Sequence, residues 1–206
     1  MKSRLTIAWV IVMVIFTSCG KEEITNQSNA ALEQGSNEAT YGKTQAARPY
    51  YESFTAISNI TPTANGVFNP GWGTGSARHM GTAKMCFNQQ VIFAMINSQP
   101  MPIGSTAAPV NQFYASQLAA AGITVPNSVS SITYDDFGNS VWFTSTTGTS
   151  LAPVSATRVN FTANLQIIGG TGRFAGASGT TLMNGYFNPQ DPNQAAVIST
   201  GGTIIY

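Results

Sequence analysis

The sequence predicts an all-β domain, either a sandwich or a barrel, with one inserted helix. Three observations support this fold class. Residues 154–168 alternate between apolar and polar side chains, which is typical of a half-buried strand. About eight β-rich runs, separated by Gly, Pro and Asn, follow one another along the chain. A single stretch, residues 109–121, instead places its apolar residues at helical spacing.

The strand predicted over residues 154–168 has the clearest two-faced pattern. Its apolar face is formed by Val159, Phe161, Ala163, Leu165 and Ile167. Its polar face is formed by Arg158, Asn160, Thr162, Asn164 and Gln166. Successive side chains of a strand point to opposite faces, so the apolar set is the face expected to line the core.

A second strand of this kind is predicted over residues 85–95. Its apolar face is formed by Met85, Phe87, Val91, Phe93 and Met95. Gln89 interrupts that face, and a buried carboxamide needs a hydrogen-bond partner or a cavity. Cys86 lies in the same strand and is expected to be a small core residue, not a nucleophile.

The remaining predicted strands are short. They are residues 53–60, 67–68, 131–134, 140–145, 180–187 and 196–206. A transmembrane β-barrel is an alternative for such a chain, but it needs a tall apolar outer band with aromatic girdles. We reject it because Gly201 and Gly202 are expected to break the last strand, and because a lipid anchor would be redundant in such a protein.

Residues 109–121 predict the helix. Pro109 suits its first turn and Gly122 suits its stop. The helix lies inside a proline-flanked segment, residues 97–127, which we interpret as an insertion that packs on the β-domain. A position across one end of the domain is a further expectation, and the idea that the insertion gates a cavity is the weaker one.

Residues 1–18 predict a secretory signal peptide. A basic start precedes an apolar run over residues 5–16, shorter than the about 20 residues that span a bilayer. The string Phe16-Thr17-Ser18-Cys19-Gly20 resembles a bacterial lipobox, in which the cysteine is lipidated and becomes the first mature residue. An ordinary cleavable signal that contains a cysteine is the alternative. With several acyl chains, Cys19 is expected to anchor the protein to a membrane without a spanning segment.

Residues 19–48 are predicted to comprise the lipidated cysteine and a flexible tether. The tether is rich in Asn, Gln, Ser, Glu and Ala, and it buries too little apolar surface to offset the entropy of ordering. Lys21-Glu22-Glu23 resembles the surface-export signal of Bacteroidetes lipoproteins, and a purely solubilising role is the alternative. The expected location is the bacterial outer membrane, with exposure at the cell surface as a further expectation.

The folded domain is predicted over residues 49–206, the size of one ordinary domain. Its charges balance, with four basic and four acidic side chains from Tyr50 to Tyr206. Nucleic-acid binding needs a basic surface, so we exclude it. Because one of the two cysteines is assigned to the anchor, Cys86 has no partner for an intrachain disulfide.

Residues 165–179 are the most specific string in the chain, an apolar strand followed by a glycine-rich turn. Residues 170–175 formally match the dinucleotide-binding fingerprint, but that site needs a helix whose N-terminus meets the pyrophosphate. Another β-rich run follows here, so we predict no nucleotide cofactor. The glycines are expected to connect two strands tightly. Phe174 then folds back on the core as a plug, and Arg173 pairs with a carboxylate or with carbonyls at the rim.

The string Gly-Gly-Thr-Gly-Arg-Phe-Ala-Gly-Ala-Ser-Gly, residues 169–179, resembles a turn of the allene oxide cyclase and dirigent barrel superfamily. It is still more similar to a group of bacterial exported proteins. Residues 73–81 and 136–143 are similar to two further segments of that group, so the resemblance spans residues 67–206. It implies a closed, mainly antiparallel eight-stranded barrel with a central apolar cavity. It implies no activity, and the plant catalytic residues do not align here.

No catalytic residue, metal site or cofactor is predicted. His79 is the only histidine, and a triad or a zinc site needs more partners than surround it, so a structural role is favoured. Asp135 and Asp136 precede Gly138, a pattern typical of a turn. Adjacent carboxylates on a strand end point in opposite directions, which does not suit a glycosidase pair. Arg173 is the residue of the glycine turn with the most functional interest.

The barrel interior is the remaining candidate site. Its expected lining and rim residues are Phe87, Gln89, Phe93, Phe161, His79 and Arg173. A closed apolar core is the alternative. The first hypothesis is a non-enzymatic, lipid-anchored cell-envelope barrel that binds an apolar small molecule or a surface partner. The second is a cyclase or isomerase acting on a small apolar substrate. It requires an ionisable group inside a water-excluded pocket, and the candidates are Glu52, Asp135, Asp136, Arg158, Arg173 and His79.

Overall fold

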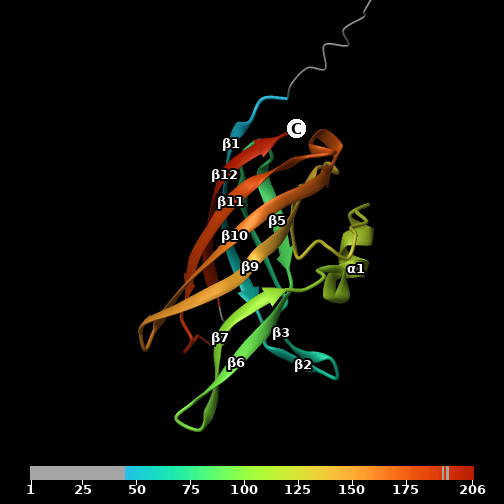
Figure 1. Cartoon of the computed structure of the whole chain (residues 1–206). Coiled ribbons are helices and arrows are strands. Elements are labelled where there is room, and N and C mark those ends of the chain that lie inside the picture. The colour runs from blue at the N-terminus through green and yellow to red at the C-terminus, as the bar shows by residue number, and fades with distance from the viewer. Residues whose placement is uncertain (1–44, 192, 194) are drawn as a thin grey trace, which may run out of the picture. The chain divides into compact units, whose positions relative to one another are not determined.

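A closed ring of eight antiparallel strands forms the folded domain, as seen in the computed structural model of the chain (Figure 1). The structure describes residues 45–191, 193 and 195–206, which belong to one compact unit, Lys43–Tyr206. The predicted signal peptide, Cys19 and the tether up to residue 44 lie outside the described residues.

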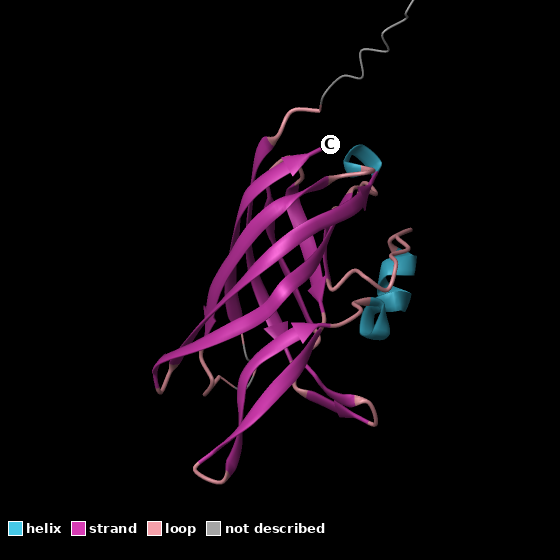
Figure 2. Ribbon diagram, in the orientation of Figure 1, coloured by secondary structure: helices cyan, strands magenta, loops and turns pink. Residues whose placement is uncertain are grey.

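The strands of the ring are mostly long and tilted (Figure 2). They are β1 (Arg48–Ser58), β4 (Gly71–Ala77), β5 (Gly81–Phe87), β8 (Ser131–Tyr134), β9 (Ser140–Ser155), β10 (Arg158–Thr171), β11 (Ser178–Phe187) and β12 (Ala196–Ile205). Their order around the ring is β10, β11, β12, β1, β4, β5, β8 and β9, and the pairing of β9 with β10 closes it. The predicted closed, mainly antiparallel eight-stranded barrel with one helix is therefore confirmed.

Four further strands extend the sheet beyond the ring. β7 (Gln99–Ala107) pairs with β9 and with β6 (Gln89–Ile96), while β2 (Thr61–Thr63) and β3 (Gly66–Phe68) form a small hairpin that joins β6. Both hairpins project beyond one end of the barrel (Figure 1). The β6–β7 hairpin carries exposed large apolar side chains: Ile92, Phe93, Met95, Ile96, Met101 and Ile103.

The single strand predicted over residues 85–95 is wrong. β5 ends and β6 begins on either side of Asn88, which is fully buried. The Asn88 side-chain amide donates to the Pro109 carbonyl at 3.0 Å and to Oε1 of Gln112 at 3.2 Å. These bonds fix a change of direction, so the chain leaves the ring and Phe93 lies exposed on the hairpin instead of in the core.

The helix α1 (Asn111–Ala120) packs on the outer wall of the barrel, beside β5 and β8 (Figure 1). Leu118 of the helix is buried in one cluster with Ile132 of β8 and Cys86 of β5. The helix therefore covers the wall and not an end. The segment predicted as an insertion, residues 97–127, contains strand β7 in its first part. Cys86 is buried as expected, and burial raises the pKa of its thiol to about 11.

Side chains close the end of the barrel where the chain terminates. The turn after β10 forms a short 3₁₀ helix, η1 (Gly172–Phe174), and the Phe174 ring is fully buried with its centroid 4.7 Å from that of Tyr206. Tyr50 and Ile204 belong to the same apolar cluster. The predicted role of Phe174 as a plug on the core is confirmed, and only the opposite end of the barrel is left open.

Candidate functional site

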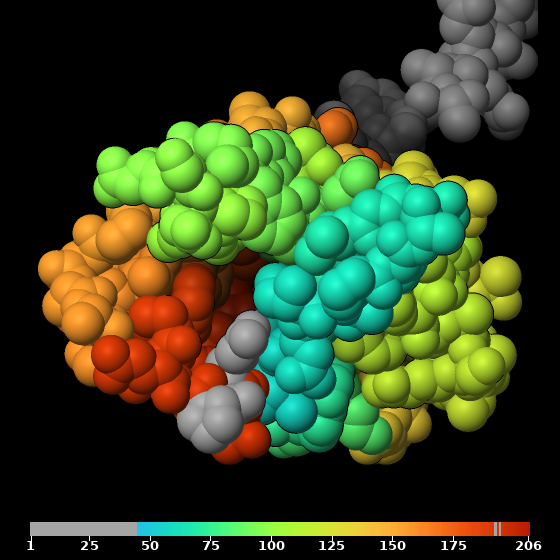
Figure 3. Space-filling view, turned by 90° about the horizontal axis from the view of Figure 1, so that it is seen from below, coloured from blue at the N-terminus to red at the C-terminus, as the bar shows by residue number. Residues whose placement is uncertain are grey.

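A cavity of about 280 Å³ occupies the end of the barrel opposite the Phe174 plug. Viewed toward that end, Figure 3 shows a hollow between the green β6–β7 hairpin, the teal segment near β2 and β3, and the red C-terminal strands. The volume is close to the lower limit of small-molecule pockets, roughly 300–1,000 Å³. The open end of the barrel is therefore sized for one small molecule.

One wall of the cavity, formed by β10, β11, β12 and the loop between the last two, is apolar. Its residues are Phe161, Leu165, Met183, Phe187, Pro189, Ala196 and Ile198. Phe161 and Leu165 belong to the apolar face predicted for residues 154–168, and the ring centroids of Phe161 and Phe187 lie 6.3 Å apart. The alternating pattern of these strands thus supplies the apolar surface directly.

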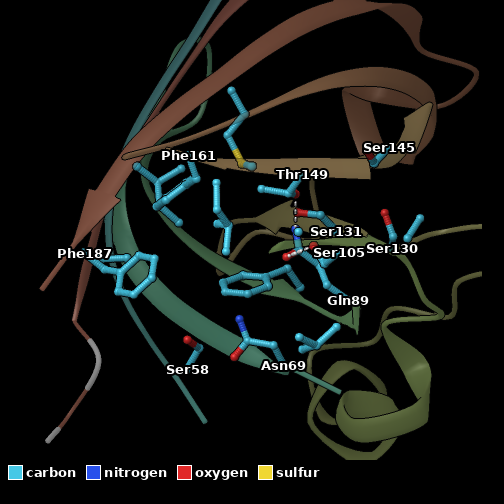
Figure 4. A pocket seen from close by; sticks show the side chains of 18 of the residues that line it. Ser58, Asn69, Gln89, Ser105, Ser130, Ser131, Ser145, Thr149, Phe161 and Phe187 are labelled. Atoms are coloured by element: carbon cyan, nitrogen blue, oxygen red, sulfur yellow. Dashed lines mark hydrogen bonds between the residues drawn. The ribbon is translucent and has the colours of Figure 1, made fainter. Parts of the chain in front are cut away.

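Across the cavity lies a strip of uncharged polar side chains, here called the polar strip (Figure 4). It consists of Asn69, Gln89, Ser105, Ser130, Ser131, Ser145 and Thr149. Gln89 is held by two hydrogen bonds: its Nε2 donates to Thr149 Oγ1 at 2.9 Å, and its Oε1 accepts from Ser105 Oγ at 2.8 Å. Gln89, which interrupts the predicted apolar face, thus has hydrogen-bond partners and also lines a cavity.

A bulge in β9 brings Thr149 beside Ser105 of β7 in the polar strip. Ser145 pairs with Leu165 and Thr149 with Ala163, so β9 carries extra residues over this interval. Gly148 lies in the bulge with φ +76°, a conformation that glycine adopts without steric cost. The bulge is the place where β9 also pairs with β7, at Ser105 and Thr149. Side chains from two separate parts of the chain therefore face the same cavity.

Two atoms of the polar strip are buried without a hydrogen-bond partner. They are the side-chain oxygens Asn69 Oδ1 and Ser145 Oγ. A buried polar atom that lacks a partner costs about 1–3 kcal/mol. Both residues line the cavity, but the two atoms themselves are shielded from solvent, so a bound molecule would supply the missing hydrogen bonds after a side-chain rotation toward the cavity.

None of the described residues that line the cavity has an ionisable side chain. Phe87, Gln89 and Phe161, named from the sequence as possible lining, lie in the cavity wall, whereas Phe93 does not. Sequence reasoning missed the rest of the polar strip, because single Ser, Thr and Asn residues in a strand or loop carry no signal for a site. Gln89 was detectable because it breaks an apolar face.

The two predicted rim residues lie at the closed end. His79 lies in the turn between β4 and β5, with its Nε2 3.3 Å from the Pro49 carbonyl and its ring centroid 5.8 Å from that of Tyr206. The Arg173 guanidinium lies over the Phe174 ring, 5.5 Å from its centroid. Neither residue lines the cavity, and both pack beside the plug.

Asp135 and Asp136 form the predicted turn. Burial raises the pKa of Asp135, but hydrogen bonds from the side chain and backbone of Asn139, a further backbone N–H and the charge of Arg173 outweigh burial and lower the pKa overall. Asp136 is exposed and forms an ion pair with Lys84. The two carboxylates thus have separate structural partners, and neither lines the cavity.

Glu52 is a buried carboxyl inside the barrel that does not line the cavity. Burial raises the pKa of Glu52, although the neighbouring hydroxyl groups of Thr133, Tyr50 and Thr200 oppose the rise. The Tyr50 hydroxyl donates to Glu52 Oε1 at 2.5 Å, and burial together with this carboxyl raises the pKa of Tyr50 strongly. Burial thus favours the neutral form of Glu52 more than it would for an exposed carboxyl.

Comparison with family models, with curated proteins and with solved structures gives no match for this chain. Within the described residues, no helix has the length and apolar character needed to cross a membrane. The same residues contain no group of three or more His, Cys, Asp and Glu side chains that could hold a metal ion. The cavity is therefore the feature from which a function is inferred.

Proposed function

We propose that this chain is a lipid-anchored cell-envelope protein that binds one small, mainly apolar molecule in the open end of its barrel. The observation that supports binding is the cavity of about 280 Å³, which is open at one end of a barrel whose other end is plugged. A cavity with an apolar wall and a few convergent polar groups is the usual form of a small-molecule site.

The anchor and the location rest on the sequence. Residues 16–20 resemble a lipobox, and Lys21-Glu22-Glu23 resembles a surface-export signal, so we propose attachment through Cys19 at the outer membrane. Kinship with the allene oxide cyclase and dirigent superfamily is likewise a proposal. Its support is the glycine-rich string at residues 169–179 together with the closed eight-stranded barrel that the resemblance implies.

A cyclase or isomerase is the second candidate, and Glu52 is the observation that favours it. A buried carboxyl with a raised pKa is a common general acid or base. Glu52, however, does not line the cavity, and the described lining has no other ionisable group. A general acid must come within hydrogen-bond reach of its substrate. Binding without turnover is therefore the better-supported proposal.

Native mass spectrometry of residues 43–206, the compact unit, tests the binding proposal. The domain is analysed as purified and after incubation with N-phenyl-1-naphthylamine, an uncharged apolar probe. We expect a complex of one probe with one barrel, or a co-purified small molecule that the probe displaces. The fluorescence of the probe gives its dissociation constant.

The Ala107→Phe variant fills the cavity, because Ala107 lies in its lining. We expect this variant to lose probe binding by at least about tenfold, since the added ring occupies the ligand's space. Phe93→Ala is the matched control, because Phe93 lies on the same β6–β7 hairpin but outside the cavity. Equal probe binding by the parent domain and Ala107→Phe, or no binding by the parent, contradicts the proposal.

A further inference from the structure

We infer that the ligand is an uncharged amphiphile, with an apolar body and a single hydroxyl or carbonyl group that binds the polar strip. The inference rests on the proposed binding function and defines the chemical class of its ligand. Its basis is the division of the cavity into two unlike walls, with Phe161 and Phe187 on one side and the polar strip on the other (Figure 4).

The hydrogen bonds within the polar strip leave specific positions for a ligand. Gln89 is committed to Ser105 and Thr149, so its carboxamide holds those two hydroxyl groups in place. Ser145 Oγ and Asn69 Oδ1 have no partner. A serine hydroxyl both donates and accepts, whereas a carboxamide oxygen only accepts. A ligand hydroxyl matches either atom, and a ligand carbonyl matches Ser145.

The absence of charge from the described lining defines the other part of the ligand's chemistry. An ionised carboxylate or ammonium group that enters the cavity loses its hydration and meets no opposite charge in the lining. That loss is costly, because a buried charge needs a partner. The cavity therefore selects against fatty-acid anions and amines, and it favours neutral molecules of the same length.

Three eight-carbon probes separate the contributions of the polar group and of charge. Octan-1-ol, 1-chlorooctane and octanoate each displace N-phenyl-1-naphthylamine from residues 43–206 at pH 8. We expect octan-1-ol to bind about three- to tenfold more tightly than 1-chlorooctane, the effect of one hydrogen bond. Octanoate is expected to bind more than about tenfold more weakly than octan-1-ol at pH 8, and to recover affinity at pH 4, where it becomes neutral.

Ser145→Ala tests the contact on the protein side. Ser145 Oγ has no internal partner, so its removal breaks no hydrogen bond of the described fold. We expect the variant to lose about three- to tenfold of its affinity for octan-1-ol. Thr181→Val is the matched control, since Thr181 Oγ1 is also buried without a partner but does not line the cavity. This control is expected to bind octan-1-ol like the parent domain.

The results distinguish this inference from the binding function beneath it. If no probe binds, the proposed function fails. If all three probes bind with equal affinity, binding stands and the uncharged-amphiphile inference is overturned. Equal effects of Ser145→Ala and Thr181→Val also overturn it, because the hydroxyl at the cavity then has no special role.

Discussion

At the scale of single residues, the burial of Glu52 is expected to make the free energy of unfolding depend measurably on pH. Its folded pKa is raised by burial, while the unfolded chain releases the proton near the usual value of about 4.3. Between the unfolded and the folded pKa, the folded state therefore holds a proton that the unfolded state has lost. By linkage, the stabilisation is fully present below the unfolded pKa and is lost as pH rises toward the folded pKa, with a slope of at most about 1.4 kcal/mol per pH unit.

The Glu52→Gln substitution should remove this dependence. The carbonyl oxygen of a glutamine accepts from the Tyr50 hydroxyl, as Glu52 Oε1 does, but a glutamine has no proton to release. We expect Glu52→Gln to be more stable than the parent domain at pH 8 and nearly equal to it at pH 4. Urea unfolding of both proteins across pH 4–8 measures the difference.

The lowered pKa of Asp135 also makes the free energy of unfolding depend on pH under acidic conditions. This contribution is the same in both proteins and cancels when they are compared. Glu52→Leu serves as the control, because it leaves the Tyr50 hydroxyl buried without its acceptor. That loss is expected to cost about 1–3 kcal/mol at every pH. Parallel stability curves for Glu52→Gln and the parent domain between pH 4 and 8 would show that Glu52 ionises inside the barrel.

Single residues differ in how much of the site they reveal from sequence. Gln89 was informative because alternation defines an apolar face, and a carboxamide on that face must find a partner. Ser145 and Asn69 were not informative. Their proposed role depends on atoms left unpaired after the barrel forms, and a single Ser or Asn in the sequence does not show which atoms stay unpaired.

At the scale of elements, β4 is a strand that its amino-acid composition does not predict. It contains Gly71, Gly73 and Gly75, and a glycine-rich segment resembles a loop in sequence. Gly75 has a packing reason: a Cβ there would lie 2.0 Å from the Ser53 carbonyl oxygen and 2.8 Å from Phe54 atoms of β1. Glycine is required because the backbone of β1 and the Phe54 ring come close to this position.

Two glycine substitutions test this explanation. Gly75→Ala forces β1 and β4 apart and is expected to destabilise the domain by about 1–3 kcal/mol. Gly201→Ala is the matched control, because its Cβ would make ordinary contacts of 3.5 Å with the Tyr51 ring. The control is expected to be neutral, or to stabilise by up to about 1 kcal/mol through the unfolded chain. Thermal unfolding of both variants measures the contrast, and equal melting temperatures contradict it.

The same elements show where sequence reasoning stops. The expected break at Gly201 and Gly202 is wrong, since β12 runs through both glycines in regular pairing with β1 and β11. The prolines of β7 predict a place in an insertion, whereas the segment is a strand of the sheet. Pro100 and Pro102 are tolerated because β9 pairs with β7 only at Gly104 and Ser105, which leaves the proline edge unpaired. Local composition does not show which strand edges have neighbours.

At the scale of the whole molecule, the barrel is closed at one end by Phe174 and has a cavity at the other. Alternation in residues 154–168 predicted half-buried strands but allowed a sandwich as well as a barrel. The choice is made by the pairing of β1 with β12, which joins strands from the two ends of the domain within the closed ring, a long-range contact that no short pattern encodes. The plug was predictable because Phe174 follows a turn of glycines. A cavity in the barrel interior was expected from the resemblance, but its polar strip was not, because part of that strip comes from the β6–β7 extension beyond the ring.

The proposed anchor concerns the whole molecule, because it determines where the barrel operates. A single acyl chain binds membranes only marginally, whereas several chains hold a protein stably. We therefore expect Cys19→Ala in the full-length protein to move it from the membrane fraction to the soluble fraction, as measured by fractionation and immunoblotting. Cys86→Ala is the control, since the Cys86 thiol is buried against α1 and should leave attachment unchanged. A Cys19→Ala protein that stays with the membrane refutes lipidation at this residue as the means of attachment.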